Sequence, residues 1–178
     1  MIVGEKELED YICEHQEDFI EALKGIYGED EDIKFLGRQV KIGESNIADL
    51  IYYYDKETEH KLDNNLLSIK EKWFIIVELK YRELVPKDLT QISRYMSALR
   101  EKLWQDYSDK YETFVEGLFV SFGQDTSMQE ITINFDFDDV HFLNIEENIS
   151  FKPESWGHKS EYIQKLKLDE RIEKLDWS

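Results

Sequence analysis

The chain has 178 residues, of which 41% are hydrophobic and 35% charged, and 40 acidic side chains against 22 Lys and Arg give it a formal charge of −18. This length suits one globular domain with a sizeable core, and the 10 Phe, 10 Tyr and 4 Trp argue against the disorder that charge alone would suggest. Only two prolines and eight glycines exclude collagen-like and low-complexity classes.

The sequence also excludes several locations and site types. Its longest apolar run, Trp73 to Val77, is too short for a membrane span, and the N-terminus lacks the basic and apolar segments of a secretory signal. The single Cys13 has no partner for an internal disulfide or a Cys-based zinc site. We therefore expect a soluble, reduced, cytoplasmic protein with no membrane partner.

The first half of the chain predicts a helix followed by three strands. Apolar residues at three- and four-residue steps predict an amphipathic helix from Glu5 to about Lys24. Strands at 33–42 and 47–54, joined by a tight turn, favour an antiparallel hairpin. The polar residues 55–71 fit either a loop or an extended hairpin arm. The apolar run that begins at Trp73 predicts a central strand buried on both faces.

The second half predicts helix, strand, strand and helix. We expect Asp88 to cap a helix ending near Gln105, followed by strands at 115–122 and 140–145. A short helix or turn is expected at 125–132 and a tail helix at 161–175. A helix between two buried strands favours a crossover connection, and hence an α/β fold with a mixed sheet of about five strands.

Charged residues at the end of the central strand suggest chemistry. Side chains alternate along a strand, so Glu78 and Lys80 share the face of the strand on which Phe74 lies. If the strand that carries Asp49 pairs with this one, the two carboxylates can converge, and a divalent cation would relieve their repulsion. The alternative is a simple ion pair between Glu78 and Lys80 where the strand reaches water.

Two polar residues follow on the next predicted helix. Gln91 and Tyr95 lie 13 and 17 residues after Glu78 and are four residues apart, which places them on one helix face. Each also has an ordinary structural explanation, because Gln91 fits a capping box that begins at Asp88 and Tyr95 fits the core. Neither explanation accounts for the order in which all these residues occur.

In that order the residues resemble a known superfamily. The series Asp49…Glu78-Leu79-Lys80…Gln91-x-x-x-Tyr95 resembles the PD-(D/E)XK nucleases that carry the Gln-x-x-x-Tyr signature of RecB-type enzymes. The segments Glu5-x-x-Leu8-Glu9-x-x-Ile12, Arg38-Gln39-Val40 and Ile47-Ala48-Asp49 are similar to the catalytic domain of NucS-like (DUF91-type) endonucleases. The resemblance covers roughly residues 5–100. It implies a restriction-endonuclease-like core in αβββαβ order, which we assign to residues 1–150, with a helical tail at 151–178 packed on it.

The resemblance also implies the roles of individual residues. Asp49 and Glu78 would bind Mg²⁺, for which Mn²⁺ can substitute, and Lys80 would serve the attacking water. Gln91 and Tyr95 would support the site or contact the DNA backbone. Glu5 would match the acidic residue of the family's first helix, with Glu9 as its rival.

The function expected from this resemblance is metal-dependent hydrolysis of DNA phosphodiester bonds. Residues 80–102 carry six basic and three acidic side chains, and candidate phosphate contacts there are Arg82, Lys87, Arg94 and Arg100. The other interpretation of each is an ordinary surface charge. We expect single-stranded, branched or mismatched DNA rather than long plain duplex, and leave open a homodimer or a separate DNA-binding partner. The alternative function is a catalytically inactive protein of the same fold that acts as an acidic interaction or DNA-mimic module, as the net charge would favour.

Overall fold

The computed structural model describes residues 4–62, 65–108, 110–122 and 139–145. Its elements in chain order are α1 (Glu5–Glu14), α2 (Gln16–Tyr27), β1 (Lys34–Ile42), β2 (Asn46–Leu62), β3 (Asn65–Lys80), α3 (Pro86–Tyr107), β4 (Glu112–Phe122) and β5 (Val140–Ile145). The helices expected at 125–132 and 161–175, and the proposed tail at 151–178, lie outside the described residues.

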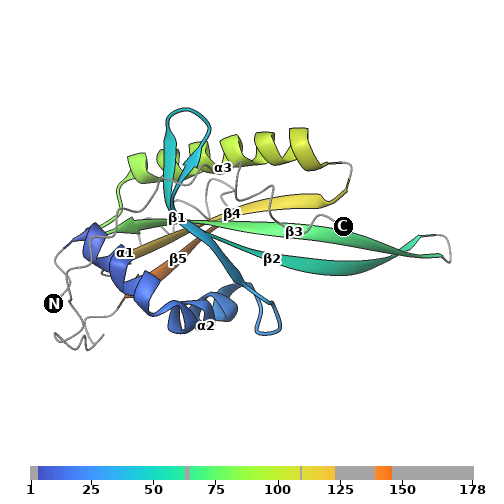
Figure 1. Cartoon of the computed structure of the whole chain (residues 1–178), viewed down its shortest axis with the longest axis horizontal. Helices are drawn as coiled ribbons and strands as arrows, with labels where there is room; N and C mark the ends of the chain where they lie inside the picture. Colours follow the sequence, from blue (N-terminus) through green and yellow to red (C-terminus); the bar gives the residue numbers. More distant parts are fainter. Residues whose placement is uncertain (1–3, 63–64, 109, 123–138, 146–178) are drawn as a thin grey trace.

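The five strands form one mixed sheet in the order β1-β2-β3-β4-β5. β1, β2 and β3 are antiparallel neighbours, whereas β4 runs parallel to β3 and β5 runs parallel to β4. α3 connects β3 to the parallel β4, as the expected crossover requires (Figure 1). The α/β class and the mixed sheet of about five strands are thus confirmed.

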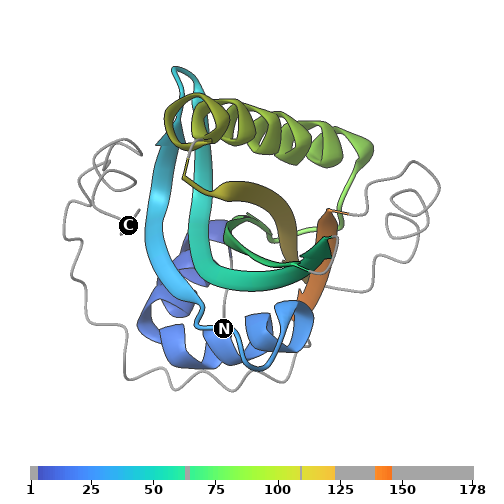
Figure 2. The same ribbon diagram turned by 90° about the vertical axis from the view of Figure 1, so that its right-hand side faces the viewer.

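Helices cover both faces of the sheet. α3 lies on one face, and α1 and α2 lie on the other (Figure 2). The alternation along β3 divides its side chains between the two cores: Phe74 and Ile76 pack beneath α3, whereas Ile75, Val77 and Leu79 pack against α1 and α2. All five side chains are almost fully buried, which confirms the prediction of a strand with both faces covered.

The N-terminal helical segment is two helices, so the prediction of one continuous helix was wrong. His15 separates α1 from α2 with φ −118° and ψ 47°, and its ring Nδ1 lies 3.0 Å from the Tyr11 carbonyl oxygen, where it can donate a hydrogen bond. The Tyr11 and His15 rings also stack, with 4.1 Å between their centroids. The break lets Leu8 from α1 and Leu23 from α2 reach the same core although the helices point in different directions.

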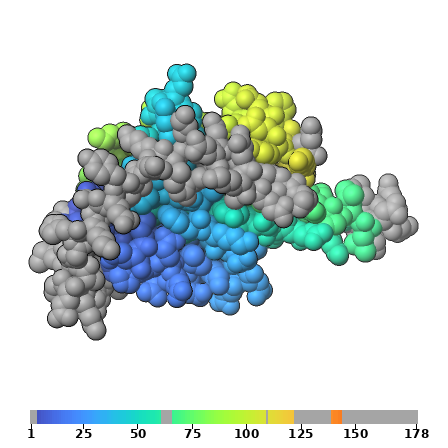
Figure 3. Space-filling view, viewed as in Figure 1, coloured from blue at the N-terminus to red at the C-terminus, as the bar shows by residue number. Residues whose placement is uncertain are grey.

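Residues 55–62 and 65–71 form the two strands of a hairpin arm. β2 and β3 stay paired from Leu50–Val77 out to Leu62–Asn65, beyond the reach of the flanking β1 and β4. The arm stands out from the body of the molecule (Figure 3). Leu66 near its tip is 71% exposed. Of the two interpretations that the sequence left open, the arm is therefore the correct one.

The N-terminal cap of α3 differs from the prediction. α3 begins at Pro86, with Val85 in an extended conformation as the cap residue, so Asp88 is the third helical residue rather than the cap. Its carboxylate still serves the helix start, because Oδ2 accepts a hydrogen bond from the Val85 backbone amide at 2.8 Å. Arg82 donates to both oxygens of the same carboxylate at 2.7 Å.

None of the helices in the described ranges has an apolar stretch long enough to cross a membrane.

Candidate functional site

Strand pairing places Asp49 beside Glu78. The antiparallel pairing of β2 with β3 ends at Leu50–Val77, and Asp49 and Glu78 are the next residues beyond that pair. Glu78 is two residues from Ile76 and accepts a hydrogen bond from Gln91 of α3, so it lies on the α3 side of the sheet. The charge of Asp49 is close enough to act on Glu78, so two residues far apart in the sequence lie near each other.

Both oxygens of the Asp49 carboxylate accept hydrogen bonds. Oδ2 accepts from the Leu79 backbone amide at 2.8 Å, and Oδ1 accepts from Gln39 Nε2 at 3.2 Å. The first bond joins Asp49 directly to the strand that carries Glu78. These two donors fix the carboxylate's orientation within the sheet.

The Glu78 carboxylate is anchored on one side only. Its Oε2 accepts from Lys80 Nζ at 3.1 Å and from Gln91 Nε2 at 3.2 Å. Gln91 Nε2 also donates to the Tyr95 hydroxyl oxygen at 2.9 Å. Oε1 is buried and has no hydrogen-bond partner. The structure thus joins Glu78, Lys80, Gln91 and Tyr95 in one network with Asp49 alongside, and leaves one carboxylate oxygen for a further ligand.

Burial dominates the electrostatics of the two acids. Burial, reinforced by the nearby Asp49 charge, raises the pKa of Glu78 to about 8, and Lys80 acts in the opposite direction. Burial also raises the pKa of Asp49, against the hydrogen bond from Leu79 and the charge of Lys80. Both carboxyls therefore hold protons more tightly than exposed ones when no cation is present.

Lys80 is a cation in this site. Burial by itself would lower the pKa of its ammonium, but the Glu78 carboxylate and its hydrogen bond raise the pKa above the ordinary value, and the charges of Glu5 and Asp49 act in the same direction. A protonated Lys80 can donate hydrogen bonds and neutralise negative charge, but it cannot accept a proton.

The two acids of the first helix occupy different positions. Glu9 is buried and contacts the site indirectly, since its Oε2 accepts from Gln39 Nε2 at 2.6 Å, the same nitrogen that donates to Asp49. Glu5 is exposed, yet its charge contributes to the raised pKa of Asp49 and of Glu78. The sequence assigned no role to Gln39, whose only signal was its place in the Arg38-Gln39-Val40 segment.

The four candidate phosphate contacts differ in their availability. Arg82 is held by Asp88, and Arg100 donates to the Val115 carbonyl at 2.6 Å and to the Asp139 carboxylate. Lys87 and Arg94 are exposed on α3, and the Arg94 guanidinium lies 5.6 Å from the centre of the Tyr95 ring. The last two are thus better placed for an anionic ligand.

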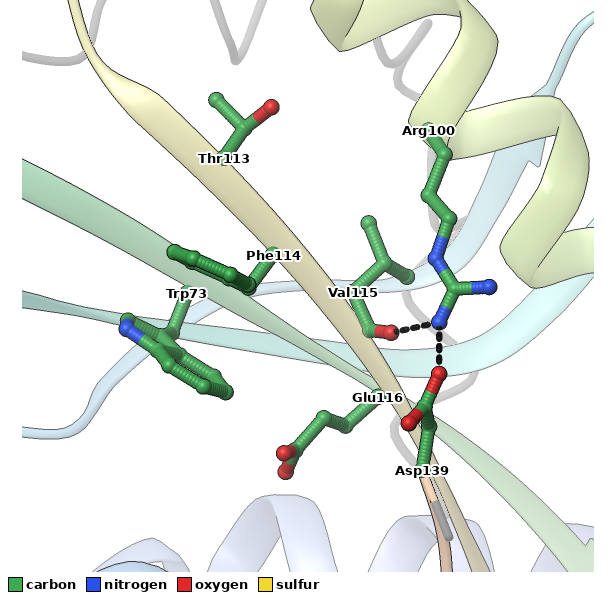
Figure 4. Close-up of a pocket in the computed structure, with 7 residues that line it drawn as sticks. All are labelled: Trp73, Arg100, Thr113, Phe114, Val115, Glu116 and Asp139. Carbon is green, nitrogen blue, oxygen red and sulfur yellow. Dashed lines mark hydrogen bonds and ion pairs between the residues drawn. The ribbon is translucent and has the colours of Figure 1, made fainter. Parts of the chain in front are cut away.

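A separate hollow lies beside the first residues of β4 (Figure 4). It is lined by Trp73, Arg100, Thr113, Phe114, Val115, Glu116 and Asp139. Trp73 pairs with Phe114 across β3 and β4, and Glu78 lies five residues further along β3, about 16 Å away at the usual rise of a strand. The hollow is therefore distinct from the site around Asp49 and Glu78.

The comparisons with known proteins name no relative. No family model, curated protein or solved structure matches the chain. What the site can do must therefore be inferred from its own residues and geometry.

The donor set fits a hard divalent cation that keeps part of its water shell. Among the described residues no group of three or more His, Cys, Asp or Glu side chains is arranged to hold a metal ion. Mg²⁺, however, is usually bound by one or two carboxylates together with waters and substrate phosphates. Asp49 and Glu78 provide two carboxylates, and the buried, unpartnered Oε1 of Glu78 is an oxygen that such an ion would satisfy.

Proposed function

We propose that this chain is a Mg²⁺-dependent deoxyribonuclease that hydrolyses phosphodiester bonds at Asp49, Glu78 and Lys80. The observation that carries the proposal is the site of Glu78, a buried carboxylate close to the Asp49 charge. One of its oxygens has no hydrogen-bond partner, and the Lys80 ammonium lies 3.1 Å from the other. Buried like charges are costly unless they serve a ligand, and perturbed groups of this kind are typical of functional sites.

The architecture supports the same proposal. Helices, three antiparallel strands, a helix and a parallel strand follow one another as in the αβββαβ order of the restriction-endonuclease-like fold, to which we assign the chain. Glu78 lies near the end of β3 and Asp49 near the start of β2, and α3 supplies Gln91 to the same carboxylate that Lys80 contacts. The series Asp, Glu-x-Lys and Gln-x-x-x-Tyr thus meets at one place in the fold.

Asp49, Glu78 and Lys80 have different roles in the proposed hydrolysis. A divalent ion bound to Asp49 and Glu78 would supply Lewis-acid activation of a water and of a phosphate oxygen. Lys80, held as a cation, donates to the attacking water or neutralises charge that develops on the phosphate. Gln91, which also donates to the Tyr95 hydroxyl, holds the Glu78 carboxylate through Oε2, and Oε1 is left without a hydrogen-bond partner in the protein.

The inactive, acidic interaction module remains the competing function. The formal charge of −18 favours it, because an acidic surface repels DNA. The network around Glu78 favours the enzyme, since an interaction surface gains nothing from a buried lysine hydrogen-bonded to a buried glutamate.

Adding a divalent metal to the metal-free protein and measuring DNA cleavage distinguishes the two functions. We expect Mg²⁺ or Mn²⁺ to restore cleavage of single-stranded, branched or mismatched DNA by the chelator-treated protein. Lys80→Ala should lower the cleavage rate about a hundredfold or more, the usual effect of removing one group that stabilises developing charge. Lys102→Ala, which removes a lysine paired with Asp106 on α3, is the matched control and should cleave at the normal rate.

Two results would reject the enzyme. One is a lack of cleavage for every substrate and metal, while circular dichroism shows that the protein is folded. The other is full activity in Lys80→Ala, which would indicate a contaminating nuclease.

A further inference from the structure

Gln39 joins the acid of the first helix to the acid of β2. Its Nε2 lies 2.6 Å from Glu9 Oε2 and 3.2 Å from Asp49 Oδ1. An amide nitrogen carries two hydrogens, so a single Gln39 side chain can donate to both carboxylates at once. It therefore occupies the space between two acids that come from different elements.

The backbone of Gln39 is held in an unfavourable conformation. Its φ of +47° is in the left-handed region, and no other residue except glycine has a positive φ in the ranges that the structure describes. Such a conformation costs on the order of 1–3 kcal/mol and persists only where the surroundings enforce it. Arg38 pairs with Leu50 and Val40 with Ala48 on either side, so the strained residue lies opposite Asp49.

The remaining side of Glu9 faces a guanidinium. Arg38 Nε lies 2.6 Å from Glu9 Oε1 as an ion pair, and Arg38 Nη2 donates to Asp10 at 2.8 Å. Gln39 thus donates to Oε2 of Glu9, whereas Oε1 accepts no hydrogen bond and is neutralised by the Arg38 guanidinium as an ion pair. The buried Glu9 carboxylate is compensated by protein groups alone.

A cation between Glu9 and Asp49 would have the same effect as the Gln39 amide, which already separates the two carboxylates. Two facing carboxylates repel unless a positive charge or a hydrogen-bond donor separates them. We propose that Gln39 takes the place of a second metal ion, so that the site binds one divalent ion through Asp49 and Glu78 and Glu9 is not a ligand. This inference rests on the proposed function and specifies the metal stoichiometry of that site.

Manganese binding tests this inference without measuring cleavage. We would count tightly bound Mn²⁺ by electron paramagnetic resonance at about 0.15 M salt, which screens weak surface binding. Anomalous diffraction from soaked crystals would locate each ion. The unaltered protein should show one ion, in contact with Asp49 and Glu78.

Removing the amide should create a second ion site. Gln39→Gly leaves Glu9 and Asp49 facing each other, and glycine accepts a φ of +47° without strain. We expect this variant to bind two Mn²⁺ ions, the second between these two carboxylates. Gln39→Glu, which keeps the side-chain shape and adds a third carboxylate, should also bind two. The matched control is Gln105→Ala, which removes an exposed amide that donates to Glu101 on α3, and it should bind one.

Each outcome bears on one proposal or the other. If the unaltered protein binds no Mn²⁺ at this place, the metal-dependent function fails. If it binds two ions there, or if folded Gln39→Gly and Gln39→Glu still bind one, this inference fails and the nuclease proposal stands. Should neither variant fold, Glu9→Gln decides: the dissociation constant for Mn²⁺ should change by less than about threefold, and a weakening of tenfold or more would make Glu9 a ligand and overturn the inference.

Discussion

Individual buried charges in this protein are compensated in different ways. Lys72 is almost fully buried, forms an ion pair with Asp55, and its ammonium lies 5.5 Å from the Tyr53 ring centre and 5.1 Å from that of Tyr111. Asp88, equally buried, is met by a guanidinium and a backbone amide. Glu78 differs from both because one of its oxygens has no partner. That difference makes Glu78 a candidate ligand. Oε1 of Glu9 also lacks a hydrogen bond, but the Arg38 guanidinium lies 2.6 Å from it.

Asp88 gives a stability prediction with a defined pH dependence. Burial would raise the pKa of its carboxyl, but hydrogen bonds from Arg82 and Val85 outweigh this and hold the pKa below its ordinary value. A group whose pKa is lowered in the folded state stabilises it above the unfolded pKa, about 3.9 for Asp, and that contribution is lost as the pH falls through the folded pKa. Asp88→Asn should therefore lower the free energy of unfolding by about 1 kcal/mol at neutral pH.

Urea unfolding at several pH values would check this prediction. The difference between the unaltered protein and Asp88→Asn should shrink as the pH falls below about 4. Asp106→Asn makes the same change at an exposed ion pair with Lys102 on the same helix, and it should alter stability by less than about 0.5 kcal/mol. A difference for Asp88→Asn that stays constant down to low pH would contradict the electrostatic explanation.

At the scale of elements, the sequence predicted what depends on local patterns. The apolar stripe of α3 and the continuous apolar run of β3 gave the correct element types, and the crossover gave the parallel pairing of β3 with β4. The break at His15 was missed because the apolar period continues across it, and the ring's contact with Tyr11 has no sequence signal. The arm was ambiguous because its stability comes from pairing with the opposite strand rather than from apolar alternation.

Two glycines in different surroundings give opposite predictions: Gly117 lies in β4 beneath α3, and Gly25 lies in α2. A methyl group at Gly117 would lie 2.8 Å from Ile92 Cδ1 and 2.9 Å from Met96 Sδ, so Gly117→Ala should destabilise the fold by about 1–3 kcal/mol. Gly25 in α2 has nothing within 4 Å of the same position, and Gly25→Ala should stabilise the protein by up to about 1 kcal/mol through helix propensity.

Denaturant unfolding measures both changes, and Ile92→Val tests the cause. This substitution removes the atom nearest to the added methyl, so the double variant Gly117→Ala, Ile92→Val should lose less stability than the two single losses combined. Simple additivity would show that the helix and strand do not meet at this contact.

At the scale of the whole molecule, the site was predictable as an ordered series but not as a set of contacts. The alternation of β3 predicted that Glu78 and Lys80 share a face, and their hydrogen bond agrees with this. Gln39 could not be found in the same way, since its role depends on a positive φ and on two acids brought to it by α1 and β2. Such a bridge exists only once distant elements have packed.

The charge of the molecule is distributed unequally between the two faces of the sheet. α1 and α2 together carry eight acidic and two basic residues, whereas α3 on the other face carries four basic and three acidic residues. Glu78 and Lys80 belong to the α3 face through the alternation of β3. An anionic polymer is therefore expected to approach from the α3 side, where Lys87 and Arg94 are exposed.

Charge reversal on α3 tests this direction of approach. Each phosphate that a protein ceases to neutralise reduces the slope of log K against log salt by about 0.7 for single strands and about 0.9 for duplex DNA. Lys87→Glu with Arg94→Glu should therefore reduce the slope for DNA binding by roughly 1.4–1.8 and weaken binding at every sequence. The matched reversal on the other face, Lys6→Glu with Lys24→Glu, makes the same change in net charge and should leave the slope unaltered, because those lysines lie on α1 and α2.

Fluorescence anisotropy measures both slopes, with labelled single-stranded and branched DNA in Ca²⁺ at several salt concentrations. The comparison depends on the two double variants having equal net charge, so a difference between their slopes can come only from where the charges lie on the molecule. A larger effect of the α3 reversal would place the DNA on the face that carries Glu78 and Lys80. Equal effects of the two double variants would show that DNA responds only to the total charge and would remove α3 from the binding surface.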